Sequence, residues 1–172
     1  MNETLKVLET RRSCRNFDKE RMVSEEDIQA VVKAGTYAAT GMGRQSPIII
    51  AVTNKELRDR LSAENAKIMG TATDPFYGAP VILIVLADKD IPTYQYDGSL
   101  VMGNLMNAAE SWDLAAFGFT GQKKSSSRTL EKRFLQILAL KAIMKELDIA
   151  QSDMQPHLPM RRHREKKTMF IM

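Results

Sequence analysis

The chain has 172 residues, of which 44% are hydrophobic and 27% charged, a composition typical of one globular domain with a buried core. It contains no apolar run near the roughly 20 residues that a membrane span requires, and its first residues predict no secretory signal. Its single cysteine, Cys14, excludes an internal disulfide and favours a reducing, cytoplasmic location.

Charge is distributed unevenly along the chain. Residues 1–111 hold 13 Lys and Arg against 15 Asp and Glu, a net charge of −2, whereas residues 112–172 hold 12 against 6, a net charge of +6. The overall charge of +4 therefore arises in the C-terminal part, which includes the basic run 161–167. Such a run resembles a nucleic-acid-binding patch, and nucleic-acid binding is kept as a remote alternative function.

Hydrophobic spacing predicts helices separated by buried strands before residue 112. The expected elements, in chain order, are a short helix over 3–10, a helix that begins near Ser24, a buried strand over 47–52, a helix over 55–69, a buried strand over 80–87 and a helix over 97–111. Helices between buried strands indicate a layered α/β domain.

The second of these helices has a well-marked beginning. Ser24 is its expected N-cap, and three acidic residues follow in the first turn, where the helix dipole favours negative charge. The helical spacing predicts an apolar face formed by Ile28, Val31, Val32 and Tyr37.

A basic segment between the first two helices could bind an anion. Arg11, Arg12 and Arg15 place three guanidinium groups, together with the hydroxyl of Ser13, within five residues. Guanidinium groups bind phosphate oxygens in bidentate geometry, although composition alone favours a solvated charge run. Cys14 has no base near it in the sequence and is expected to be a small packing residue.

A glycine-containing segment, residues 40–46, precedes the first buried strand. Glycines let a backbone approach a ligand closely, and the side chain of Gln45 can both donate and accept hydrogen bonds. Taken alone, this segment has the composition of an ordinary turn. Residues 74–80, which precede the second strand, are explained adequately as a structural turn.

Four segments in this order closely resemble the nitroreductase family of FMN-dependent oxidoreductases. They are RRSCRNF, TGMGRQSP, DPFYGAPVILIVLAD and DGSLVMGNLMNAAES, and the resemblance covers residues 5–111. It implies an α+β three-layer sandwich and a homodimer with FMN at its interface. It also implies that NAD(P)H gives a hydride to the flavin, which then reduces a small nitroaromatic or quinone-type acceptor in a ping-pong reaction.

The resemblance also implies where the flavin binds. The RRSCR segment would hold its phosphate and ribityl chain, and the loop near residue 40 would reach it from the partner subunit. Gly43 stands where the family usually has asparagine. No side chain is expected to act as a catalytic acid or base, and no metal site is expected. The cofactor-binding residues so implied are Arg11, Arg12, Ser13, Arg15, Thr40, Gly41 and Gln45.

Residues 112–172 look like the family's C-terminal half translated in a shifted reading frame. The family continues with GLGSxWIHRAKEVF and ends near APRKEDYVYY, and this chain shows neither sequence in frame. New codons can be formed from the last base of each codon and the first two bases of the next, and such codons are compatible with both family sequences. In this frame Trp112 followed by Asp113 must encode glycine, and residues 162–172 are compatible with the whole family ending. We therefore separate an FMN-binding part, 1–111, from an anomalous basic part, 112–172, in which a helix over 130–149 can form.

This division leaves two main interpretations of the chain. The first is an active flavoenzyme of the nitroreductase family. The second is a frameshifted remnant that lacks flavin contacts and part of the central sheet, and that folds poorly or does not turn over. A membrane partner is not expected in either case.

Overall fold

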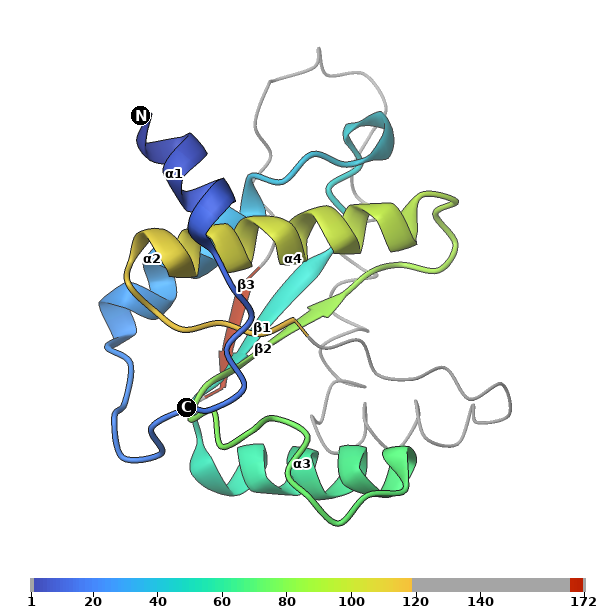
Figure 1. Cartoon of the computed structure of the whole chain (residues 1–172). Helices are drawn as coiled ribbons and strands as arrows, with labels where there is room; N and C mark the ends of the chain where they lie inside the picture. The colour runs from blue at the N-terminus through green and yellow to red at the C-terminus, as the bar shows by residue number, and fades with distance from the viewer. Residues whose placement is uncertain (1, 119–167, 172) are drawn as a thin grey trace.

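The computed structural model describes residues 2–118 and the strand 168–171 (Figure 1). Its elements, in chain order, are α1 (Glu3–Thr10), α2 (Glu25–Thr36), the 3₁₀ turn η1 (Gly41–Gly43), β1 (Ile48–Val52), α3 (Lys55–Met69), β2 (Ile82–Leu86), α4 (Tyr94–Ser111) and β3 (Thr168–Ile171). The helices and strands predicted before residue 112 are all present, with small shifts at their ends. The helix predicted over 130–149 and the basic run 161–167 lie outside the described residues.

The sheet has the strand order β2-β1-β3. β2 pairs with β1 in antiparallel orientation, with Ile84 opposite Ile50, and β3 pairs with β1 in parallel, with Met169 opposite Ile50. The mixed sheet makes the fold α+β, as the family resemblance implies, and corrects the α/β class that the alternation of helices and strands indicated. One strand of the sheet comes from the C-terminal part of the chain.

The sheet is the middle layer of three. Ile49 and Ala51 of β1 pack into one cluster with residues of α2 and α4, whereas Ile50 and Val52 pack into a second cluster with Leu61 of α3. Because successive strand residues point to opposite faces, a strand covered on both faces needs the unbroken apolar sequence of β1. Figure 1 shows α4 and α3 on opposite sides of the sheet.

Gly35 lets α2 approach α4 closely. A Cβ at this position would lie 2.5 Å from Cδ2 of Leu105 in α4 and 2.9 Å from Cδ1 of Ile49 in β1. The Ser24 N-cap is confirmed, because its side chain accepts a hydrogen bond from the Asp27 N–H at 3.1 Å.

The prediction that Tyr37 belongs to the apolar face of α2 is wrong, because 52% of its surface is exposed. The helix ends at Thr36, so the chain leaves the helical spacing one residue before Tyr37. Ala38 is buried instead.

The turn before β2 runs back along α3. Gly70 ends the helix in the left-handed conformation, with φ 68°. Asp74 then accepts a hydrogen bond from Ser62 Oγ at 2.6 Å, and Arg58 Nε, one turn closer to the start of α3, donates to the Ala79 carbonyl at 2.9 Å. The chain therefore returns to the end of the sheet where β1 finished, which makes β2 antiparallel to β1.

Asp74 is the centre of this turn. Its carboxylate accepts hydrogen bonds from Ser62, from Arg58 and from the backbone N–H groups of Phe76 and Gly78. Burial alone would raise the pKa of Asp74, but these four donors outweigh burial and lower it to about 2. Arg58 is itself only 8% exposed, and its guanidinium carbon lies 5.7 Å from the centre of the Phe76 ring.

Asp74→Asn is expected to lower the free energy of unfolding at pH 7 by about 2 kcal/mol, because it removes the more buried of the two carboxylates, Asp74 and Asp59, that pair with Arg58. The folded-state pKa lies below the unfolded value, so this contribution is present above about pH 4 and is lost as the pH falls toward 2. Urea unfolding at pH 7 and below pH 3 measures it. Asp59→Asn, whose carboxylate is 47% exposed, is the control and should change stability by less than about 1 kcal/mol. Equal losses for the two variants would contradict the expectation.

Two leucines of α4 give a matched test of the core. Leu105 is 4% exposed and Leu100 is 50% exposed. Leu105→Ala should cost about 2–5 kcal/mol because it opens a cavity between α2, α4 and β1. Leu100→Ala should cost less than about 1 kcal/mol. Thermal or urea unfolding compares them, and a Leu100→Ala loss as large as that of Leu105→Ala would show that Leu100 is buried in solution.

Candidate functional site

The arginine segment follows α1 and lies beside the chain that leaves α4. The Cys14 N–H donates to the Ala116 carbonyl at 3.0 Å, and Ser13 forms a parallel β-bridge with Ala116. Cys14 is half-buried, and its thiol donates to the Asn16 carbonyl at 3.1 Å, which fits a packing role. The first residues after Ser111 therefore form one side of this segment.

The three guanidinium groups have different surroundings. Arg12 Nη1 donates to the carbonyls of Glu9 and Arg11, both at 2.8 Å, where α1 ends. The Arg15 guanidinium lies 5.0 Å from the centre of the Phe117 ring. Nη1 of Arg11 is buried and has no hydrogen-bond partner. None of these arginines belongs to the ion pairs found in the described part of the chain, so their positive charge is not neutralised by a carboxylate there.

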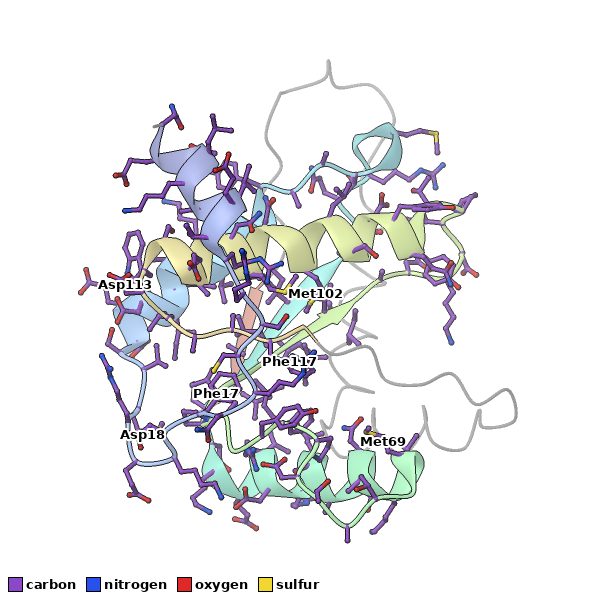
Figure 2. All side chains as sticks on the ribbon, in the orientation of Figure 1. Phe17, Asp18, Met69, Met102, Asp113 and Phe117 are labelled. Atoms are coloured by element: carbon purple, nitrogen blue, oxygen red, sulfur yellow. The ribbon has the colours of Figure 1, made fainter. Side chains whose placement is uncertain are left out.

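Phe117 connects the arginine segment to the turn before β2. Its ring meets the Tyr77 ring edge to face, with centroids 5.2 Å apart and an interplanar angle of 89°. In Figure 2 the labelled Phe117 lies between α4 and α3 in the view. Arg15, Phe117 and Tyr77 thus form a row of one cation and two rings contributed by three separate segments.

The loop 40–46 begins next to the N-terminal end of α4. The Gly41 N–H donates to Oδ1 of Asp97 at 2.9 Å, and the Gln45 N–H donates to the Thr40 hydroxyl at 3.0 Å. Gln45 has φ 52°, in the left-handed region that is unusual for residues other than glycine. The loop is therefore held at both ends by hydrogen bonds and carries a strained backbone between them.

Three side-chain atoms in the described residues are buried without a hydrogen-bond partner: Arg11 Nη1, Gln45 Oε1 and Ser46 Oγ. All three belong to the two segments, RRSCRNF and TGMGRQSP, that sequence reasoning singled out for cofactor binding. Buried polar atoms are nearly always paired, so unpaired ones indicate a partner that is not among the described residues. A ligand with phosphate and hydrogen-bonding groups would suit one guanidinium donor and two oxygen atoms.

No hydrogen bond between described residues joins the two segments to each other. The hydrogen bonds of the arginine segment lead to residue 116, whereas those of the loop lead to α4. Sequence reasoning predicted the helix over 97–111 without any site residue in it, and it missed Asp97, which is 2% exposed and holds the loop. An acidic residue that the helical pattern places on a buried face was the signal available.

Neither a metal site nor a membrane span emerges from the described residues. They contain no cluster of three or more His, Cys, Asp or Glu side chains that could hold a metal ion. Within the same ranges, every helix is too short or too polar to cross a bilayer.

Comparison with known proteins identifies the family of the chain. The nitroreductase family model matches residues 8–146. A curated relative from Archaeoglobus fulgidus, provisionally named an NADH dehydrogenase/NAD(P)H nitroreductase, is 32% identical over 97 residues, which are 56% of this chain and 52% of the relative. The chain thus spans about half the length of that curated relative.

Solved structures share the fold. A Bacteroides fragilis nitroreductase with bound FMN has a TM-score of 0.69 at 24% identity, with 80% of each chain covered. A Desulfitobacterium hafniense nitroreductase with bound FMN has a TM-score of 0.59 at 34% identity, over 65% of this chain and 66% of the other. The family match covers most of this chain and runs past Ser111. The chain belongs to the nitroreductase family.

Proposed function

We propose that the chain is an FMN-dependent oxidoreductase that uses NAD(P)H to reduce a small nitroaromatic or quinone-type acceptor. The observation that carries this proposal is the location of the three unpaired buried polar atoms, Arg11 Nη1, Gln45 Oε1 and Ser46 Oγ. Family membership and the FMN-bound relatives support it. Bound FMN would supply a centre that accepts hydride from NAD(P)H and passes electrons on.

The arginine segment would hold the phosphate end of the cofactor. Arg11 offers a buried nitrogen without a partner, and Arg15 offers an exposed guanidinium without an ion-pair partner among the described residues. Ser13 would add a neutral hydrogen bond. Nη1 of Arg12 is already bonded to the end of α1, so this residue would contribute its charge more than new hydrogen bonds.

We further propose a homodimer in which Thr40, Gly41 and Gln45 reach the cofactor of the partner subunit. In a single chain, helix α1 has no buried residue, and its Leu5 and Leu8 are 52% and 54% exposed. A second chain packed against α1 would cover these leucines. We propose a cytoplasmic location, which the single free cysteine supports.

The division at residue 111 is also part of the proposal. We propose that residues 112–172 derive from the family's C-terminal half by a change of reading frame. Two observations argue against a change of reading frame. The family match extends to residue 146, and residues 168–171 form a strand of the sheet. Resequencing the gene across codons 105–120 tells where the shift arose. An extra base there would mean that the true protein carries GLGSxWIHRA and the family ending, and an unchanged sequence would mean a genuinely frameshifted gene, for which we expect weak flavin binding and little or no turnover.

Arg11→Ala should weaken FMN binding by about tenfold or more, because a charge-assisted hydrogen bond to a phosphate is worth roughly 1.5–3 kcal/mol. Quenching of flavin fluorescence during titration with the purified chain measures the affinity. Arg60→Ala, which removes an exposed guanidinium from the outer face of α3, is the matched control and should leave the affinity unchanged. Equal affinities for the two variants would remove Arg11 from the site.

The purified chain should be yellow and should oxidise NADH or NADPH faster when a quinone is added. A stopped-flow experiment separates reduction of the bound flavin by NAD(P)H from its reoxidation by the acceptor, and a ping-pong reaction requires both half-reactions. A colourless chain that does not bind added FMN would instead identify the non-catalytic remnant.

A further inference from the structure

A buried carboxylate outside the arginine segment is not explained by the proposed chemistry. Asp97 lies in the first turn of α4 and is 2% exposed. Its Oδ1 accepts the Gly41 N–H at 2.9 Å, and its Oδ2 accepts the Thr93 hydroxyl at 3.0 Å. Burying a charge is unfavourable unless it is hydrogen-bonded, and the first turn of a helix is also where its dipole stabilises negative charge.

The loop held by Asp97 has a backbone that needs external support. Met42, Gly43 and Gln45 have φ of 54°, 64° and 52°. Met42 and Gln45 are not glycine, so the left-handed region is energetically unfavourable for them. Such conformations persist only where surrounding contacts fix them. The structure provides the contact to Asp97 at the start of the loop and the Thr40–Gln45 hydrogen bond across it.

Gly41 is fixed by close packing as well as by the hydrogen bond. A Cβ on Gly41 would overlap the hydroxyl of Thr93 and would lie 2.8 Å from its Cγ2. Thr93 itself is bonded to Asp97, so both contacts of Gly41 lead to the same buried carboxylate. The hydrogen bond and the close packing together fix the position of Gly41 at the start of the loop.

We propose that Asp97 is a positioning residue that sets the conformation of the loop 40–46 and thereby presents Gln45 and Ser46 to the cofactor. The effect on FMN rests on the proposed function, whereas the effect on the loop does not. Without the carboxylate, the Gly41 N–H loses its acceptor, and Met42, Gly43 and Gln45 relax from their left-handed conformations.

The test compares three variants of the full chain. Asp97→Ala removes both acceptors, and Asp97→Asn can keep one acceptor for Gly41 while its amide donates to Thr93. Asn104→Ala is the matched control, because Asn104 also lies on α4 but donates to the Ala34 carbonyl at 3.1 Å, away from the loop. Each variant is examined for thermal unfolding, for FMN affinity by fluorescence titration, and for the rate of tryptic cleavage after Arg44, an exposed residue of the loop.

Asp97→Ala should raise cleavage after Arg44 and the FMN dissociation constant by about tenfold each, while cleavage after Arg60 and Lys67 in α3 stays unchanged. In Asp97→Asn, the cleavage rate after Arg44 and the FMN dissociation constant should both stay within about threefold of those of the original chain. Asn104→Ala should lower the unfolding temperature without changing either value.

If Asp97→Ala proves too unstable to purify, Gly41→Ala replaces it. The added Cβ would meet Thr93 and displace the start of the loop, so the same increases are expected from a change made on the loop side. Unchanged cleavage after Arg44 in Asp97→Ala, or in Gly41→Ala where that variant replaces it, would overturn the proposal. If the original chain binds no FMN, the proposed function fails, and cleavage after Arg44 still decides the role of Asp97.

Discussion

The contact between Arg58 and Asp74 determines how the chain enters the second strand. A strand followed by a helix normally leads to a parallel strand, because the helix carries the chain back to the starting end of the sheet. Here the residues after α3 retrace the helix, and Asp74, Ser62 and Arg58 hold them against it. The antiparallel pairing of β1 with β2, the position of Tyr77 beside Phe117 and the path of the chain into α4 all depend on this return.

The helices and strands before residue 112 follow from local sequence because local physics determines them. Ser24 caps the beginning of α2, and the β-branched apolar run 48–52 is typical of a strand covered on both faces. The strand orientation could not be predicted in this way. It depends on hydrogen bonds between residues 12 to 21 positions apart, such as Arg58 with Ala79, and no periodicity in the sequence records them.

The candidate site, likewise, could be predicted from the sequence only in part. The arginines and the glycine loop were visible as unusual combinations of residue types, and the unpaired atoms at Arg11, Gln45 and Ser46 fall within those segments. Asp97 was hidden because a carboxylate in the first turn of a helix has a sufficient local explanation in the helix dipole. Its function as an acceptor for Gly41, 56 residues away, exists only in the folded chain.

The C-terminal part affects the sheet and the site in different ways. β3 joins β1 through backbone hydrogen bonds, which any sequence with adequate strand propensity can make, and Thr, Phe and Ile in residues 168–171 provide that propensity. A flavin phosphate held by a particular arginine, in contrast, requires that side chain. A shifted reading frame can therefore leave a strand in the sheet while removing side chains that the cofactor needs, so an intact fold does not by itself establish an intact site. Flavin affinity, rather than stability, is the property that distinguishes the two interpretations of this chain.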